Sequence, residues 1–177
     1  MSSAQELQDQ GVKLFGQKEY EAAARTFGQA MEQYEADGNK AVAAEMQVNI
    51  GLVHRALGEH QQALDAMQAA LHTFQSSDDK LHTAMTLGNI GGVYAALGDK
   101  EQAYNCYRNA ADLFDEVGEK KMHGETMVAM ASLQVRDGKL SAGADTYAVG
   151  LDELDNLTAG QKLLKGLIGV RKKILGS

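Results

Sequence analysis

The chain has 177 residues and no proline, with 44% apolar, 23% charged and only 6% aromatic residues. This composition predicts one foldable soluble domain, and it disfavours a β-sandwich or barrel relative to helices. The net charge of −7 argues against nucleic acid as a partner, because contacts to phosphates need a basic surface.

The first predicted helical unit covers residues 3–38. It begins with a capping-box sequence, because Ser3 is followed three residues later by Glu6, and Gly38 marks its end. The first six residues have neither the basic nor the apolar segment of a signal peptide. Cys106 is the only cysteine, which suggests a reducing compartment. We therefore expect a cytoplasmic protein.

The second unit, residues 39–78, is predicted to form two helices that are separated at Gly58. Apolar residues recur every three or four positions on both sides of this glycine: Met46, Ile50, Val53 and Leu57 before it, and Ala63, Leu64, Met67, Ala70, Leu71 and Phe74 after it. A glycine in that place is typical of a left-handed helix C-cap. The run from Ser76 to Asp79 then offers N-cap residues for the next helix.

The third unit, residues 79–118, repeats the second at a step of 40 residues. When residues 49–74 are aligned with residues 89–114, 11 of the 26 positions are identical, among them Asn49 and Asn89. The same step finds matching residues in the first unit and in a fourth, residues 119–156. Four units in one register predict a repeat architecture, in which each unit packs on its neighbours.

The fourth unit carries Gly143 and Gly150 where the other units have alanine, so its second helix is expected to be the least stable. Residues 157–175 follow, and five cations but no acid occur from residue 156 onward. Their apolar residues are predicted to share one helix face: Leu157, Leu164, Leu167, Ile168, Ile174 and Leu175. We interpret this segment as a capping helix over the last unit. The alternative is a basic amphipathic helix that docks on a membrane or a partner.

The repeated positions resemble the tetratricopeptide repeat over about residues 5–155. They are the small residue after Ile50 and Ile90, the rings of His54 and Tyr94, the turn glycines Gly58 and Gly98, and the alanines Ala63, Ala70, Ala103 and Ala110. The 40-residue unit without a final proline is similar to the long-repeat branch of kinesin light chains, rapsyn and Leu-Gly-Asn repeat proteins. The resemblance implies an all-α right-handed solenoid of four helix pairs plus a capping helix, within one domain over residues 1–177.

The resemblance also implies a concave groove, because in this family the first helix of each pair lines the ligand site. The residues expected to line a peptide-binding groove are Val12, Phe15, Glu45, Val48, Asn49, Leu52, Arg55, Met85, Gly88, Asn89, Gly92, Glu125, Val128 and Arg136. This mixture of apolar and polar groups is typical of a ligand site. The branch that binds Hsp70 or Hsp90 tails uses a carboxylate clamp, and of its matching positions only Asn49 fits, so no such clamp is expected.

Two asparagines and two glycines carry the sharpest hypotheses about this groove. The amides of Asn49 and Asn89 can both donate to and accept from a peptide backbone, whatever its sequence; a local helix contact is the alternative role. Gly88 and Gly92 lie four residues apart on the groove face, and the repeat pattern gives neither a packing reason. We predict a shelf without side chains beside Asn89, with neutral drift as the alternative.

The reactive residue types give no support for catalysis. The five histidines lack the spacing of a metal site, Cys106 has no partner for nucleophilic chemistry, and no phosphate-binding glycine motif is present. We expect no enzyme activity, no metal and no cofactor. The predicted function is a scaffold or adaptor that binds a peptide segment or partner helix of some basic character, since the body is acidic. The alternative is a self-assembling module that associates through its terminal repeats or the capping helix; the oligomeric state is open, and a membrane partner is not expected.

Overall fold

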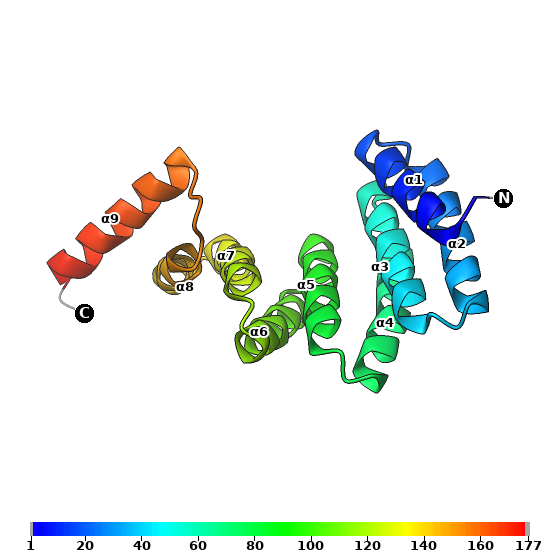
Figure 1. The fold of residues 1–177 in the computed structure, drawn as a ribbon. Helices are drawn as coiled ribbons and strands as arrows, with labels where there is room; N and C mark the ends of the chain where they lie inside the picture. The colour runs from blue at the N-terminus through cyan, green and yellow to red at the C-terminus, as the bar shows by residue number, and fades with distance from the viewer. Residues whose placement is uncertain (1, 176–177) are drawn as a thin grey trace.

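The computed structural model describes residues 2–175, which form nine α-helices and no strand. The first eight helices make four antiparallel pairs: α1 (Ala4–Gly16) with α2 (Tyr20–Ala36), α3 (Lys40–Leu57) with α4 (His60–Ser76), α5 (Lys80–Leu97) with α6 (Lys100–Val117), and α7 (Lys120–Arg136) with α8 (Leu140–Asp152). The pairs lie one after another along the molecule, and α9 (Ala159–Leu175) follows at the end opposite α1 (Figure 1). The predicted all-α repeat fold is therefore confirmed.

Helix boundaries follow the caps that the sequence supplies. Ser3 and Glu6 make both hydrogen bonds of the predicted capping box at the start of α1. From the run of polar residues before α5, Asp79 is the cap, because its carboxylate accepts from the backbone N–H of His82. Gly58 closes α3 in the left-handed conformation with φ of 78°, and Lys18 takes φ of 63° in the corresponding turn of the first pair. Lys18 thus has a left-handed backbone conformation, which glycine adopts more readily than lysine.

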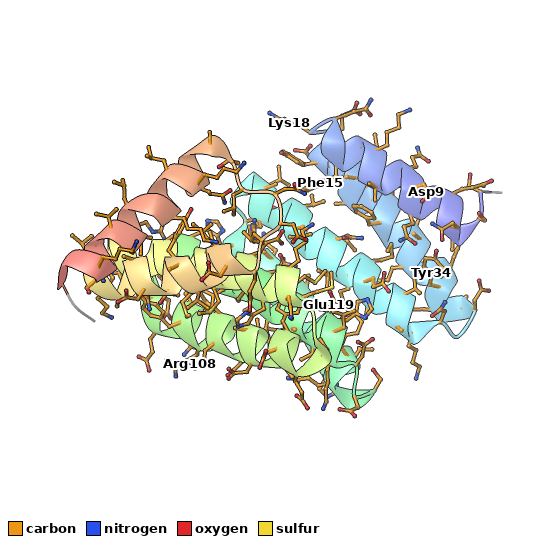
Figure 2. The ribbon with its side chains drawn as sticks, turned by 60° about the vertical axis from the view of Figure 1, so that its left-hand side comes forward. Asp9, Phe15, Lys18, Tyr34, Arg108 and Glu119 are labelled. Atoms are coloured by element: carbon orange, nitrogen blue, oxygen red, sulfur yellow. The ribbon has the colours of Figure 1, made fainter. Side chains whose placement is uncertain are left out.

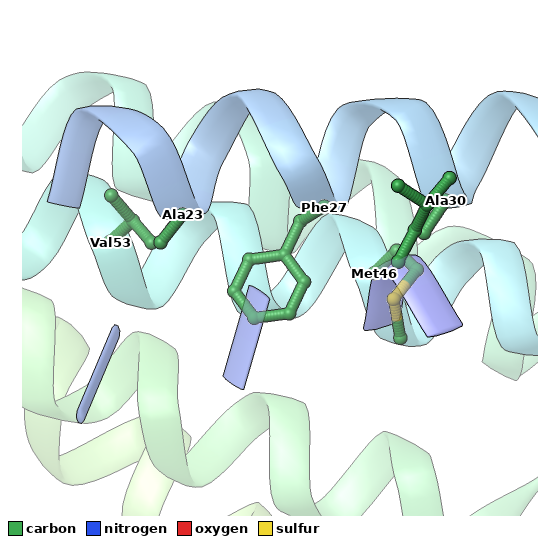
Figure 3. Packing of buried hydrophobic residues seen from close by; sticks show 6 residues of the cluster. Ala23, Phe27, Ala30, Met46 and Val53 are labelled. Atoms are coloured by element: carbon green, nitrogen blue, oxygen red, sulfur yellow. The ribbon is translucent and has the colours of Figure 1, made fainter. Parts of the chain in front are cut away.

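The core runs between the pairs and is built from alanines and a few large side chains. On α2, Phe27 lies between Ala23 and Ala30, and Met46 and Val53 of α3 pack against this row (Figure 3). The two alanines, Met46 and Val53 are 0% exposed. Alanine at these positions lets neighbouring helices approach closely enough for the large side chains to interlock.

In the fourth pair, the glycine that takes the role of Gly51 and allows the two helices to approach closely lies on the second helix and not on the first. A Cβ atom on Gly51 of α3 would lie 2.7 Å from Met67 Cγ and 3.1 Å from the carbonyl oxygen of Ala63 on α4. In the fourth pair α7 carries Ala131 at the equivalent place, and a Cβ atom on Gly143 of α8 would lie 3.2 Å from the carbonyl oxygen of Ala131. Gly143 is therefore a packing requirement of α8, a role that helix propensity alone does not indicate.

The last helix covers α8 with only part of its apolar surface. Ile168 is 5% exposed, Lys165 pairs with Asp152 at 2.7 Å, and Arg171 pairs with Asp145 at 3.0 Å. The sequence pattern places Leu167 on the same face as Ile168, but Leu167 is 59% exposed in the structure. The side chains of Ile174 and Leu175, which complete the predicted face, lie outside the described residues. Along residues 2–175, none of the helices combines the length and apolar character that crossing a bilayer requires.

Candidate functional site

A hollow of the described residues lies over the first helices of three successive pairs. Its volume is about 670 Å³. The lining residues come mainly from α5 and α7: Arg55, His60, Met85, Gly88, Asn89, Gly92, Ala96, Tyr107, Phe114, Met122, Glu125, Thr126 and Ala129. We call this surface the central groove. It combines an apolar floor with a few polar groups at its rim, which is the usual make-up of a ligand site.

A smaller hollow of about 120 Å³ adjoins the central groove and shares Met85 and Asn89 with it. Its lining residues are Glu45, Val48, Asn49, Phe74, His82, Met85, Thr86 and Asn89. Asn49 and Asn89 therefore face one continuous surface, as the repeat register predicts. Within residues 2–175 neither side-chain amide forms a hydrogen bond to another protein group. Both amides are available to a ligand.

Five of the residues expected in the groove line neither the central groove nor the hollow that adjoins it. Val12 is 56% exposed on α1, and Phe15 pairs with Tyr20 at a ring distance of 5.5 Å. Phe15 and Asp9 lie on α1, at the end of the molecule opposite α9, so the groove does not extend across the first pair (Figure 2). Leu52 packs against the core cluster that contains Ala63.

The fourth of these residues, Arg136, reaches back from α7 to α5, where its Nη2 donates to the carbonyl oxygen of Ala95 at 3.5 Å. Val128 lies in a separate hollow of about 550 Å³, between α7 and the connection to α9. Glu125 lines both this hollow and the central groove. The central groove is thus made by the second, third and fourth pairs.

Three aromatic residues of the floor come from second helices, where the sequence pattern predicts only core. Phe74 belongs to α4, and Tyr107 and Phe114 belong to α6. Phe74 stacks on the ring of His82 with centroids 5.0 Å apart. In the sequence, only the hydroxyl of Tyr107 could have indicated that this position lies in the groove. The aligned positions of the first two units, Phe27 and Met67, carry no polar atom in their side chains.

Ion pairs hold the rim of the smaller hollow. His82 Nδ1 lies 2.8 Å from the carboxylate of Asp79, and its Nε2 lies 3.6 Å from Glu45 Oε1. This histidine joins α3 to α5 when it is protonated, because Glu45 and His82 belong to adjacent pairs. The imidazole of His54, predicted to be a packing ring, lies with its Nδ1 2.6 Å from Glu59 Oε2.

Gly88 and Gly92 differ in their surroundings. A Cβ atom on Gly88 would meet no other atom within 4 Å, whereas a Cβ atom on Gly92 would lie 2.9 Å from Arg55 Nη1. The guanidinium of Arg55, the flexible end of its side chain, occupies the space above Gly92. The proposed shelf is open only at Gly88.

The described residues include no group of three or more His, Cys, Asp or Glu side chains placed to hold a metal ion. The Cys106 thiol is buried, and burial raises its pKa above the ordinary value, which disfavours the reactive thiolate. The side chains that line the central groove offer hydrogen bonding, ion pairing and apolar contact.

A sequence model of the tetratricopeptide repeat family matches residues 42–116, which include most of the second and third pairs. Among solved structures, the apo form of RapI superimposes with a TM-score of 0.79 at 14% identity, covering 99% of this chain and 48% of RapI. BtubC (BKLC) from P. vanneervenii superimposes with a TM-score of 0.68 at 15% identity, covering 94% of this chain and 64% of BtubC. The chain thus spans about half of RapI and under two thirds of BtubC, and both show the same fold. No curated protein sequence is similar enough to count as a relative.

Proposed function

We propose that this chain is a non-catalytic adaptor that binds a peptide segment or partner helix in the central groove, because residues 42–116 match the sequence model of the tetratricopeptide repeat family, whose members generally mediate protein–protein interaction. The observation that carries the proposal is the pair of unengaged amides, Asn49 and Asn89, beside an apolar floor. Each amide offers a donor and an acceptor, which matches the alternating groups of a peptide backbone. The proposal places the chain in a reducing compartment such as the cytoplasm, consistent with its lone Cys106 thiol.

A groove that is formed before binding reduces the ordering cost on the protein side. The ordering cost then falls mainly on the ligand, so a segment that is already helical or extended is favoured. The groove has apolar contacts to offer from Met85, Phe114 and Met122, and polar ones from the asparagines. We therefore expect a ligand that alternates apolar side chains with an accessible backbone.

Selection from a displayed library of random peptides tests this proposal. Selected peptides are then measured by fluorescence anisotropy against Asn49→Ala, Asn89→Ala and the matched control Asn109→Ala, which alters an exposed asparagine of α6. Each groove variant should weaken binding roughly 2- to 12-fold, the effect of about 0.5–1.5 kcal/mol for a neutral hydrogen bond. Circular dichroism should show unchanged helicity. Peptides that bind both groove variants as tightly as the control variant would contradict the proposal.

A second function, self-assembly, is supported by the exposed apolar side chains of α9. Leu163, Leu167 and Val170 are 67%, 59% and 54% exposed, and they share one face of the helix. An association through this face should raise the mean molar mass with protein concentration in light scattering. Leu163→Gln with Leu167→Gln should abolish that increase.

A further inference from the structure

Two arginines from different helix pairs approach the C-terminal part of α5. A Cβ atom on Gly92 would lie 2.9 Å from Arg55 Nη1 and 3.8 Å from Arg55 Cζ, so this guanidinium lies against the α5 backbone from the α3 side. Arg136 arrives from α7, and its Nη2 donates to the carbonyl oxygen of Ala95. Gly92 and Ala95 are three residues apart, so both guanidiniums lie at the same turn of α5.

The hydroxyl of Tyr107 lies beneath this turn. It would be 3.7 Å from a Cβ atom on Gly92, the same point that Arg55 approaches. Burial raises the pKa of the Tyr107 hydroxyl above its ordinary value, and the positive charges of Arg55 and Arg136 oppose this rise in part. The neutral hydroxyl is a donor that can join the guanidiniums around an acceptor.

A histidine of the central groove is also unsatisfied. His60 lines the central groove, and its buried Nδ1 has no hydrogen-bond partner among the described residues. A buried polar atom without a partner costs free energy unless a ligand or water satisfies it. When this nitrogen carries a proton, it adds a further donor to the groove.

Neither arginine has an acidic partner, although acids are abundant. Arg171 pairs with Asp145, whereas Arg55 and Arg136 form no ion pair within residues 2–175. The chain has 24 acidic residues against 17 lysines and arginines, so two unpaired guanidiniums at one place are not a result of a shortage of acids. Glu125 of the central groove and Glu45 of the adjoining hollow belong to the first two turns of α7 and α3, whereas the arginines lie at the last turn of these helices.

We propose that Arg55, Arg136 and the Tyr107 hydroxyl form a binding site, at the edge of the central groove, for a carboxylate side chain of an acidic peptide segment that lies in this groove. The proposal rests on the proposed function, and it specifies the ligand. The overall acidity of the chain favours a basic partner, but the arginines at this end of the groove require an acidic residue in the ligand. A guanidinium presents a planar fork of donors that matches a carboxylate. Two forks from opposite sides of α5 fix the position of the carboxylate along the groove.

The chain offers a direct readout, because it has only five arginines. Nuclear magnetic resonance can follow the Nε–H signals of all five while acetyl-pentaglutamate-amide is added at about 0.15 M salt, where long-range attraction is screened. The signals of Arg55 and Arg136 should shift and saturate. Arg55→Gln and Arg136→Gln should each weaken binding of this peptide at least roughly tenfold, as expected for lost charge-assisted hydrogen bonds. The matched control is Arg25→Gln, which removes an exposed charge of α2 and should leave binding unchanged.

Three outcomes would overturn the assignment: neither arginine signal moves, Arg25→Gln weakens binding as much as the groove variants, or inorganic phosphate moves the signals while the glutamate peptide does not. The outcome is separable from that of the proposed function. If library peptides without acidic residues bind through the asparagines, the adaptor function is supported and the carboxylate site is contradicted. If pentaglutamate shifts the arginine signals but no library peptide binds, the carboxylate site is supported and the general backbone-binding function is contradicted.

Discussion

Gly124 of α7 and Gly150 of α8 face each other so closely that neither position has room for a methyl group. A Cβ atom on Gly150 would lie 2.6 Å from the carbonyl oxygen of Gly124, and a Cβ atom on Gly124 would lie 2.7 Å from that of Gly150. The other pairs have alanine at both places, for example Ala84 with Ala110. The fourth pair is thus closer at this end, because both of its helices are without a side chain.

The first prediction follows from this contact. Gly150→Ala should lower the free energy of unfolding by about 1–3 kcal/mol, the cost of overpacking against a backbone atom that cannot move aside. Helix propensity alone predicts the opposite sign, a gain of up to about 1 kcal/mol. Gly28→Ala is the matched control, since a Cβ atom there would meet nothing within 4 Å, and it should stabilise the protein. Urea denaturation distinguishes the two; equal gains for both variants would show that α7 and α8 are further apart than described.

Gly88 and Gly92 support a second prediction. Gly88→Ala should raise the free energy of unfolding by up to about 1 kcal/mol, because the position is helical and open. If a ligand lies on the shelf, the same variant should bind selected peptides less well. Gly92→Ala should displace the guanidinium of Arg55 and weaken binding of acidic peptides more than of neutral ones. A stabilised Gly88→Ala variant with undiminished peptide binding would leave neutral drift as the reason for this glycine.

The third prediction concerns Asp137, at the turn between α7 and α8. Hydrogen bonds from Lys100 and Lys139 lower the pKa of its carboxyl to about 2, and the two Nζ atoms lie 2.5 and 2.8 Å from its oxygens. A carboxyl whose pKa is lower in the folded state stabilises the fold above its unfolded pKa, near 4, and this contribution disappears as the pH falls towards 2. Asp137→Asn should therefore be less stable than wild type at pH 7. The difference in urea midpoint should shrink steadily between pH 4 and pH 2; a constant difference would exclude a role for the charge.

The fourth prediction separates the two faces of α9. Ile168→Ala should loosen this helix, because Ile168 is its buried contact with the last pair, whereas Leu163→Ala should not, since Leu163 is 67% exposed. Amide hydrogen exchange of residues 159–171 measures the effect. Deletion of residues 157–177 should cause aggregation or unfolding, because Leu151 of α8 is 0% exposed in the intact chain. A truncated protein that remains monomeric with an unchanged melting temperature would show that α9 is a docking helix and not a cap.

The repeat made the helices predictable, whereas the groove depends on contacts that the repeat does not encode. Gly58 and Asp79 mark helix ends through local backbone chemistry, which a single sequence reveals. The position of Asn89 beside Asn49 follows from the same register. The position of Arg55 over Gly92 does not, because a long side chain can extend in several directions, and the choice depends on the neighbouring pair. The prediction that Leu167 packs together with Ile168 failed for a related reason, because an apolar helix face is buried only where a partner helix covers it.

The three glycines of α5 have a consequence for the order in which the molecule folds. Gly88, Gly91 and Gly92 together reduce the intrinsic stability of this helix by roughly 2–3 kcal/mol relative to alanine, so α5 does not nucleate on its own. We expect it to become helical mainly by packing against α4 and α6, which carry large side chains of the shared core. We therefore expect α5 to form after the helices on which it packs. A chain that ends at Leu97 should leave residues 80–97 unprotected from amide exchange, while residues 40–76 stay folded.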